Sequence, residues 1–183
     1  MEEPIVKVEH LSHRYSVQWA VKDISFEIPK RGIYGLLGSN GAGKSTVMNI
    51  ICGVLKQTEG NVLIHGADTR LEPLEAKKHI GFLPQQAPLY TDMTVEEYLT
   101  HSAYLRRMPD KEIKSAVEEV MERCSIMHFR SRLIKNLSGG YQQRVGIAQA
   151  IVHKPALVVF DEPTNGLDPN QILDIRRLIQ DIA

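Results

Sequence analysis

The sequence has little of what marks secreted, membrane-spanning or nucleic-acid-binding proteins. Its 183 residues include two cysteines, Cys52 and Cys124, whereas small secreted scaffolds depend on several disulfides. The longest wholly apolar run extends from Ala156 to Phe160, and a membrane-spanning helix needs roughly 20 apolar residues. Lysine plus arginine number 22, as do aspartate plus glutamate, so no charge excess favours nucleic acid or anionic lipid. These absences predict a cytosolic protein with reduced thiols and no nucleic-acid partner.

What the sequence does contain is typical of one folded domain. Hydrophobic residues make up 43% and charged residues 24%, close to the averages of globular proteins. A length of 183 residues fits one domain at roughly 100 to 200 residues per domain. The opening segment, Met1 to Val6, is acidic and lacks the apolar stretch of a secretory signal, so we expect no export.

The first third of the chain alternates between apolar and polar residues and then becomes rich in glycine. The alternation up to residue 28 predicts an antiparallel ribbon of two half-buried strands. Residues 32–38 predict a short buried strand, followed by a glycine-rich turn and a helix over about residues 44–54. Two further strands are expected at residues 61–66 and 79–83. This order of strand, loop and helix predicts an α/β fold.

The middle of the chain has the spacing of helices. Thr94 and Glu97 match a helix-capping box, and apolar residues follow with helical spacing. A second helix is expected after Asp110, so residues 93–134 are predicted to form an α-helical insert. Beyond it we expect a helix beginning at Ser138, a buried strand over 156–160 and a final helix opened by Pro169.

The glycine-rich turn matches the phosphate-binding P-loop motif. The motif requires two glycines separated by four residues and followed by lysine and serine or threonine. Backbone N–H groups of such a loop point at phosphate oxygens, and the following helix adds the positive end of its dipole. The bland alternative is a glycine turn before a helix that carries an exposed lysine. The residues assigned to the phosphates are Gly38, Ser39, Asn40, Gly41, Ala42, Gly43, Lys44, Ser45 and Thr46.

Two carboxylates follow the predicted strand near residue 160. In a parallel sheet, ligands bind where the carboxyl ends of the strands emerge, which here brings Asp161 and Glu162 to the binding edge. Asp161 is a candidate ligand of Mg²⁺ together with Ser45, and Glu162 is the candidate group that polarises the attacking water. Without the P-loop, a buried strand that ends in solvated acids would be the simpler interpretation.

The segment Leu137-Ser138-Gly139-Gly140-Tyr141-Gln142-Gln143-Arg144 resembles the signature motif of ATP-binding-cassette (ABC) ATPases. The chain is also similar to this family at Tyr15, in the loop that contains Gln85, and in Gly166-Leu167-Asp168-Pro169. These motifs stand in the family's order from residue 15 to residue 169, so the resemblance covers nearly the whole chain.

The resemblance implies a set of roles for the nucleotide site. ATP and Mg²⁺ are the expected cofactors, with Tyr15 stacking on the adenine and Lys44 reaching the β- and γ-phosphates. Glu162, Lys44 and Gln85 are the expected catalytic residues. Gln85 is also expected to sense the metal, which adds it to Ser45 and Asp161 as the metal set. A solvated loop glutamine and a rim tyrosine are the alternatives for Gln85 and Tyr15.

The resemblance also implies a second subunit. Ser138 stands at the N-cap position of a helix, and Gly139 and Gly140 leave its first N–H groups uncovered, which creates an anion site. In the family this site meets the nucleotide held by the partner in a head-to-tail dimer, and Asp168 is expected to cross the same interface. A turn formed by Asp168 and Pro169 is the alternative.

Two departures from the family stand out. Tyr141 occupies the fifth signature position, where many members have glutamine. No histidine occurs from Glu162 to Ala183, although the family has a switch histidine beyond one more strand, and His153 precedes the acidic strand. The seven histidines are therefore assigned to the surface or to packing: His10, His13, His65, His79, His101, His128 and His153.

The resemblance defines one ABC nucleotide-binding domain over residues 1–183 whose final strand and switch-histidine region are absent. Its fold class is α/β, a P-loop NTPase core with a parallel sheet, an antiparallel β amino-terminal subdomain and an inserted α-helical subdomain. The ATP-binding core covers residues 1–92 and 135–183, and the helical subdomain covers 93–134.

The resemblance predicts the ATP-hydrolysing subunit of a membrane transporter. The expected form is an exporter with separate integral membrane subunits, and the cassette is expected on the cytoplasmic face of the membrane as a homodimer or a paired subunit. One alternative is a non-transport ABC ATPase that acts on ribosomes, DNA or iron-sulfur assembly. Another is an ATP-binding module with little turnover. Residues 1–183 are expected to bind ATP but to hydrolyse it weakly, because phosphoryl transfer depends on every charge-stabilising group.

Overall fold

A computed structural model describes residues 3–183 and divides the chain into two compact units. One unit extends to Ile80, and the other extends from Gly81 to Ile182. Each unit combines a β-sheet with α-helices, so the expected α/β class is confirmed.

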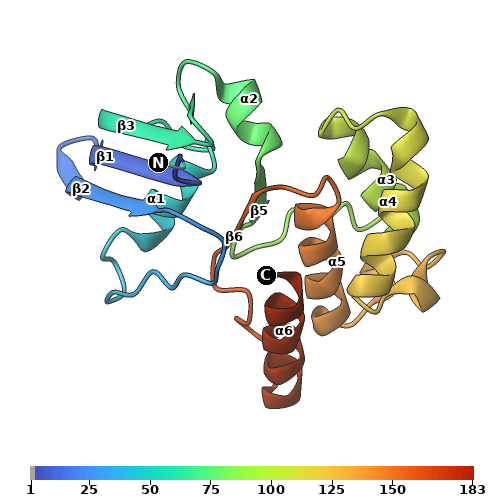
Figure 1. Cartoon of the computed structure of the whole chain (residues 1–183). Helices are drawn as coiled ribbons and strands as arrows, with labels where there is room; N and C mark the ends of the chain where they lie inside the picture. Colours follow the sequence, from blue (N-terminus) through green and yellow to red (C-terminus); the bar gives the residue numbers. More distant parts are fainter. Residues whose placement is uncertain (1–2) are drawn as a thin grey trace. The chain divides into compact units, whose positions relative to one another are not determined.

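The first unit is built on a four-stranded antiparallel sheet, in the blue and teal part of Figure 1. Its strands are ordered β2-β1-β3-β4, and the bounds are β1 Val6–Tyr15, β2 Gln18–Ile28, β3 Glu59–Ile64 and β4 Ala67–Asp68. The predicted antiparallel ribbon is confirmed as β1 and β2, with Val6 opposite Ile28 and Tyr15 opposite Gln18. Val6 and Val8 are buried and Lys7 between them is not, because successive strand side chains point to opposite faces. The alternation ends where the register with β2 shifts, and the consecutive residues 11–13 are all buried.

Two helices complete the first unit, α1 Lys44–Ile51 and α2 Pro73–Lys78. Helix α1 lies against β2 and β3. Its buried side chains meet the apolar face of the sheet, whose deepest residues are Val6, Val8, Leu11, Val62 and Ile64. The amphipathic spacing predicted for the helix is thus explained by burial on one face.

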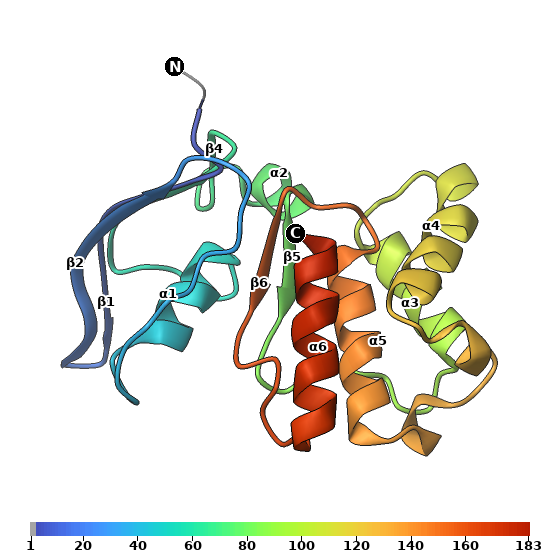
Figure 2. The ribbon, with the colours of Figure 1, turned by 60° about the horizontal axis from the view of Figure 1, so that its bottom comes forward.

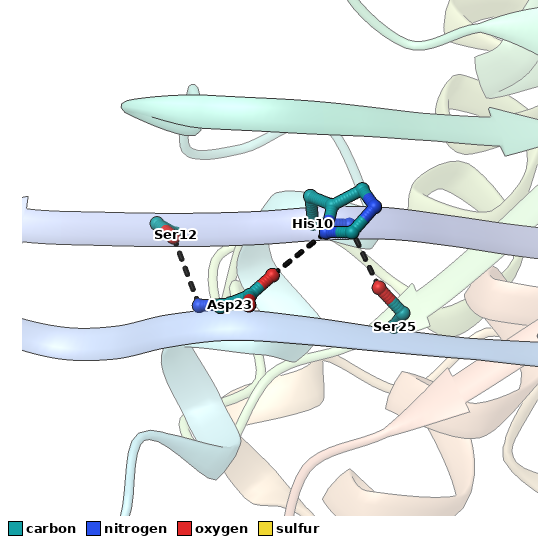
Figure 3. A network of polar contacts seen from close by, with 4 residues as sticks. All are labelled: His10, Ser12, Asp23 and Ser25. Atoms are coloured by element: carbon teal, nitrogen blue, oxygen red, sulfur yellow. Dashed lines mark hydrogen bonds and ion pairs between the residues drawn. The ribbon is translucent and has the colours of Figure 1, made fainter.

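Irregular pairing between β1 and β2 is stabilised by short polar contacts (Figure 3). His10 and Asp23 have positive φ angles of 50° and 52°, which is uncommon for residues other than glycine. The Nδ1 atom of His10 lies 2.8 Å from Oδ1 of Asp23, and Ser25 Oγ accepts a hydrogen bond from the His10 N–H. Ser12 Oγ accepts from the Asp23 N–H. Side-chain oxygens therefore replace the ladder partners that the irregular register removes.

The strand expected at residues 32–38 is not formed, and that prediction is wrong. Residues 33–39 have no regular secondary structure, and every residue from 31 to 42 is exposed. Leu37 is 93% exposed and Ile33 62% exposed. A buried parallel strand needs hydrogen-bonded neighbours, and no strand of the antiparallel sheet pairs with this segment. The apolar run therefore belongs to neither sheet.

The second unit combines a small sheet with four helices, seen together in Figure 2. Strand β5 pairs with β6, and the long helical connection between them is the crossover that parallel strands require. The elements are β5 Ile80–Leu83, α3 Val95–Leu105, α4 Asp110–Arg123, α5 Gly139–Ile151, β6 Leu157–Phe160 and α6 Pro169–Ile182, with 3₁₀ turns at Met127–Phe129 and Ile134–Asn136. The strand predicted over 156–160 is confirmed as β6, but its residues are half-buried rather than buried as expected.

The predicted helices at residues 94–105 and after Asp110 are confirmed as α3 and α4. Thr94 Oγ1 accepts from the Glu97 N–H, and the Glu97 carboxylate accepts from the Thr94 N–H, which completes the expected capping box. Arg130 pairs with Glu96 of α3 and with Glu118 of α4, which ties the two helices to the turn that follows them.

Helix α5 packs closely on β5 because glycines remove side chains at the crossing. A Cβ at Gly81 would lie 2.0 Å from the Ala150 carbonyl oxygen, and a Cβ at Gly146 would lie 2.8 Å from Leu83 Cδ1. Gln149 Nε2 donates to the Phe82 carbonyl at 2.8 Å, so a polar contact also joins the two elements.

Both cysteines are buried, and no disulfide joins them. Burial raises the pKa of the Cys124 thiol to about 12, so this thiol stays protonated, as expected of a core residue. Among residues 3–183, no helix combines the length and the apolar character that crossing a membrane requires.

Candidate functional site

The residues of the phosphate-loop motif form an exposed turn that leads into α1. Ala42 N–H donates to the Ser39 carbonyl at 3.1 Å, which closes the turn. Lys44 Nζ donates to the carbonyl oxygens of Gly38 and Ser39, both at 2.9 Å. The ammonium group of Lys44 therefore lies against the carbonyl oxygens of the loop. Asn40, Gly41 and Ser45 are exposed.

Gly43 is the residue that allows the loop to enter the helix. It is the N-cap of α1 with φ 86°, a left-handed conformation that favours glycine. A Cβ there would lie 2.6 Å from the Ala20 carbonyl oxygen and 2.7 Å from Val21 Cγ2. No side chain caps the helix, so the N–H groups of its first turn have no side-chain acceptor from the cap. Such a terminus favours an anion.

Tyr15 lies at the end of β1, next to the same helix. Its hydroxyl is 3.4 Å from Oγ1 of Thr46, which is buried in the first turn of α1. Tyr15 is 53% exposed, and its ring lies nearly perpendicular to that of His13 at 4.7 Å between ring centroids. Tyr15 thus offers an aromatic face to solvent while its hydroxyl contacts the phosphate-loop helix.

In the second unit, Gln85 and Glu162 are in direct contact. Gln85 Nε2 donates to Glu162 Oε2 at 3.0 Å, although the two residues are 77 positions apart in the chain. Asn165 Nδ2 lies 3.5 Å from the same oxygen. Glu162 is exposed and has φ 49°, a conformation that non-glycine residues adopt where other contacts maintain it. Sequence reasoning missed Asn165, although its position in the turn after the acidic pair was a usable signal.

Asp161 differs from its neighbour in being buried, with 7% exposure. Its N–H donates to the Leu83 carbonyl at 3.0 Å, which continues the pairing of β5 and β6 by one residue. Carboxylate, hydroxyl and amide oxygens are the ligand types that Mg²⁺ takes, and Mg²⁺ characteristically uses one or two protein carboxylates together with phosphates and water. Within the described part of the chain no three His, Cys, Asp or Glu residues form a cluster that could hold a metal ion.

Ser138 stands at the N-cap of α5, as expected. Its carbonyl accepts from the N–H groups of Tyr141 and Gln142, but its hydroxyl makes no capping hydrogen bond. Gly139 is exposed and has open space around it, since a Cβ there would meet no atom within 4 Å. The first N–H groups of α5 therefore remain available, which is what an anion site at a helix terminus needs.

Tyr141 and Arg144 fix the start of α5 to its surroundings. The Tyr141 ring packs edge-to-face on Phe129 at 4.5 Å between centroids. Arg144 Nη1 donates to the Cys124 carbonyl at 3.0 Å, and Nη2 lies 3.7 Å from Oδ2 of Asp174 in α6. The aromatic residue at the fifth signature position is thus a packing contact with the segment that follows α4.

Asp168 is the N-cap of α6. Its Oδ1 accepts hydrogen bonds from the N–H groups of Asn170 and Gln171, both at 3.0 Å. Gln171 Oε1 lies 3.4 Å from the Asp168 N–H, so the two residues have the reciprocal arrangement of a capping box. Sequence reasoning missed Gln171, although its position three residues after an N-cap aspartate is the signal for such a box.

Several known proteins resemble the chain along most of its length. A family model described as ABC transporter matches residues 21–165. The Lipopolysaccharide export system ATP-binding protein LptB of Haemophilus influenzae is 35% identical over 97% of this chain and 75% of its own length. The Bacitracin transport ATP-binding protein BcrA of Bacillus licheniformis is 36% identical over 98% of this chain. This chain spans 58% of the length of BcrA.

Solved structures give the same result. The structure of cbiO1 from Clostridium perfringens, part of the ABC transporter complex cbiONQ, superimposes with a TM-score of 0.86 and 31% sequence identity. The match covers 99% of this chain and 74% of that chain. The family model covers well over half of the residues, and the relatives are more than 30% identical over nearly all of them. The chain belongs to the ABC transporter family, among its ATP-binding subunits.

Proposed function

We propose that the chain binds and hydrolyses ATP as the energy-supplying subunit of an ABC exporter. The observation that carries the proposal is the contact of Gln85 Nε2 with the exposed Glu162 carboxylate, directly after the buried Asp161. An exposed carboxylate whose orientation is held by an amide is suited to polarise a water molecule. Gln85 supplies that amide and leaves the second carboxylate oxygen for the water.

The phosphates of ATP are assigned to residues 38–46. Lys44 already directs its ammonium group at the loop. If phosphate oxygens replaced its two carbonyl acceptors, its hydrogen bonds would join two charged groups and would be stronger. Tyr15 is the platform for the adenine, because an aromatic face stacks on a base without reading its edges. Ser45, Gln85 and Asp161 are the residues that would hold Mg²⁺, which when bound neutralises charge developing on the phosphates.

The proposed assembly is a head-to-tail pair of cassettes. Ser138, Gly139 and Gly140 would meet the phosphates held by the other subunit, and Asp168 would cross the same interface. Support comes from the uncapped first turn of α5 and from the open space at Gly139. Backbone N–H groups bind an anion without a basic surface, which agrees with a formal net charge of +0.

Separate integral membrane subunits are the proposed partners, and the cytoplasmic face of the membrane is the proposed location. The name of one relative supports the direction, because LptB belongs to a lipopolysaccharide export system. The name of BcrA supports a role in transport. The helices α3 and α4, with the Gln85 loop before them, are the proposed link to the membrane subunits. In this scheme the binding and hydrolysis of ATP alternately close and open the cassette pair.

The experiment compares Glu162→Gln with Glu122→Gln, an exposed glutamate of α4. Glu162→Gln is expected to lower the rate of ATP hydrolysis by about 100-fold or more, because a positioned base contributes about 10²–10⁴-fold. Its affinity for ATP should stay unchanged, since the phosphate loop is intact. Glu122→Gln should leave both quantities unchanged. Hydrolysis that survives Glu162→Gln, or a wild-type protein that binds no ATP, would contradict the proposal.

Co-purification tests the partner. The tagged protein is expected to bring down a polytopic membrane protein from detergent-solubilised membranes. Recovery with ribosomes would instead support a non-transport ATPase of the same family.

A further inference from the structure

The first turns of α5 and α6 face one another across a small pocket. Its lining includes Ser138 and Gly140 from the start of α5, and Gln171 and Asp174 from the start of α6. The two helices lie side by side in both views of the ribbon (Figures 1 and 2). The two segments that carry the proposed contacts to a partner's nucleotide, residues 138–140 and Asp168, therefore begin adjacent helices of one unit.

Gln171 contacts both segments. Toward its own helix, its Oε1 faces the Asp168 N–H at 3.4 Å, while its N–H donates to Oδ1 of Asp168 at 3.0 Å. Toward α5, its side chain fills the space over Gly140. A Cβ at Gly140 would lie 2.9 Å from both Cδ and Nε2 of Gln171. One amide thus caps Asp168 with its oxygen end and packs on the signature turn with its nitrogen end.

A second contact between the helices lies one turn farther along each of them. Arg144 of α5 lies 3.7 Å from Asp174 of α6, and its guanidinium also donates to the Cys124 carbonyl. The Arg144 side chain is 18% exposed and the Asp174 side chain 53% exposed, so water screens this pair in part. Gln171 therefore lies beside a second polar contact between α5 and α6, and its packing on Gly140 is the closer of the two.

We propose that Gln171 is a positioning residue that couples the Ser138–Gly140 turn to Asp168. Through it the two segments approach the partner's nucleotide as one unit, and a shift of the signature turn moves Asp168 with it. The inference rests on the proposed function, because it assumes that both segments meet a nucleotide held by a second subunit. The coupling itself is a property of one chain and is measured without a partner.

Three variants distinguish the role of the oxygen of the Gln171 side-chain amide from the role of its nitrogen. Gln171→Ala removes both contacts. Gln171→Glu keeps an oxygen for the Asp168 N–H, since glutamate serves equally at this position of a capping box. It also replaces the nitrogen end with a second carboxylate oxygen beside Gly140, where the partner's phosphates are expected. Gln180→Ala, at an exposed position in the last turn of α6, is the matched control.

The first measurement is amide hydrogen exchange of the protein without nucleotide. In the first segment, at the start of α5, Gln171→Ala is expected to raise exchange of the Tyr141 and Gln142 N–H groups, which donate to the Ser138 carbonyl, because the packing on Gly140 is lost. In the segment 168–171 it is expected to raise exchange of the Asp168, Asn170 and Gln171 N–H groups. The rise in each segment should be up to about 10-fold, the size of the effect of one lost hydrogen bond. Gln171→Glu should keep residues 168–171 near the wild-type rate, and Gln180→Ala should change neither segment. If Gln171→Ala raised exchange only at residues 168–171, the side chain would serve its own helix alone and the coupling would be refuted.

The second measurement is dimer formation induced by ATP in a Glu162→Gln background, followed by sedimentation. Gln171→Ala and Gln171→Glu are expected to weaken the ATP-bound dimer by about 10-fold, which corresponds to one lost hydrogen bond or one like-charge contact. ATP affinity of the single chain should stay unchanged, because the phosphate loop belongs to the other unit. If the Gln171 variants dimerised as well as Gln180→Ala, the positioning role would be refuted. If the background protein formed no dimer with ATP, the proposed function would fail while hydrogen exchange still decided the coupling.

Discussion

The phosphate loop of the first unit and the acidic turn of the second unit are held in different ways. Residues 31–42 are all exposed, and the loop is shaped by glycine φ angles and by a lysine that folds over its own carbonyls. In the second unit, Asp161 is buried and Glu162 is held by the Gln85 side chain. The conformation of the phosphate loop therefore depends on the φ angles its glycines allow. The acidic turn instead depends on side chains from distant parts of the sequence.

This difference predicts which substitutions each region tolerates. The loop should be sensitive at positions where a Cβ meets backbone, and insensitive to changes of its exposed side chains that spare the lysine. The acidic turn should respond to the removal of long-range partners. Variants in each region therefore separate backbone constraint from side-chain support.

The largest effect is expected for Gly43→Ala. The substitution adds a Cβ 2.6 Å from the Ala20 carbonyl at a residue with φ 86°. Positive φ in a non-glycine residue costs about 1–3 kcal/mol, and the clash adds to this because the Ala20 carbonyl is backbone and cannot rotate away. We expect a clear loss of thermal stability in the first unit and a loss of ATP binding, measured by calorimetry on the same sample.

Gly41→Ala is the matched control for Gly43→Ala. Gly41 has a similar φ of 80°, but a Cβ there would meet no atom within 4 Å. Its effect should be limited to the cost of the conformation, so Gly41→Ala should be the milder variant. Equal effects of the two variants would show that the contact with Ala20 contributes nothing.

Local signals explain how much of this structure was predictable from the sequence. The capping box of Thr94 and Glu97 was predicted because its partners are three residues apart. The β1–β2 ribbon was predicted from alternation within each strand. The exposure of residues 33–37 was not, because burial of an apolar strand depends on neighbours that its own sequence does not specify.

The candidate site follows the same division. The phosphate loop could be recognised from its spacing, because glycine and lysine positions reflect local geometry. The pairing of Gln85 with Glu162 spans 77 positions, and only the resemblance to the family suggested that both residues serve one site. The packing of Gln171 on Gly140 was not predicted, because it depends on how two helices lie side by side.

Lowering the pH is expected to have an intermediate effect on the stability of the helical segment. Hydrogen bonds from Lys135 to Asp92, from Arg130 to Glu96, and from the Thr94 N–H to Glu97 lower the pKa of each of these carboxyls. A carboxyl with a lowered pKa in the folded state stabilises the fold above its ordinary pKa, and this stability is lost as the pH falls through the lowered value. The helical segment should therefore lose stability from about pH 4.5 downward, near the ordinary pKa of glutamate.

Circular dichroism across pH 2 to 7, with hydrogen exchange to locate the change, measures this effect. Among residues 3–80, one carboxyl, that of Glu75, has its pKa lowered by a hydrogen bond from a side chain, that of Lys78. The β1–β2 ribbon is expected to outlast α3 and α4 as the pH falls. Arg130→Gln should make the stability of the helical segment less dependent on pH, because it removes the partner of Glu96. If the ribbon lost its protection before α3, side-chain support would not be what distinguishes the two units.

The smallest effect is expected for Tyr15→Phe, which tests whether side-chain support extends into the first unit. The change removes the contact of the Tyr15 hydroxyl with Thr46 Oγ1, which at 3.4 Å is long for a bond between two oxygens. A net loss of about 0.5 kcal/mol or less is expected, below the usual 0.5–1.5 kcal/mol of one hydrogen bond. The aromatic face remains, so ATP affinity should change by less than about threefold.

Tyr15→Ala is the comparison, because it removes the face as well as the hydroxyl. Under the proposed stacking role it should weaken ATP binding far more than Tyr15→Phe, as measured by titration with ATP. Equal losses in the two variants would assign the effect to the hydroxyl. The phosphate loop would then depend on a side chain of β1 in the way that Glu162 depends on Gln85, and the contrast between the two units would no longer hold.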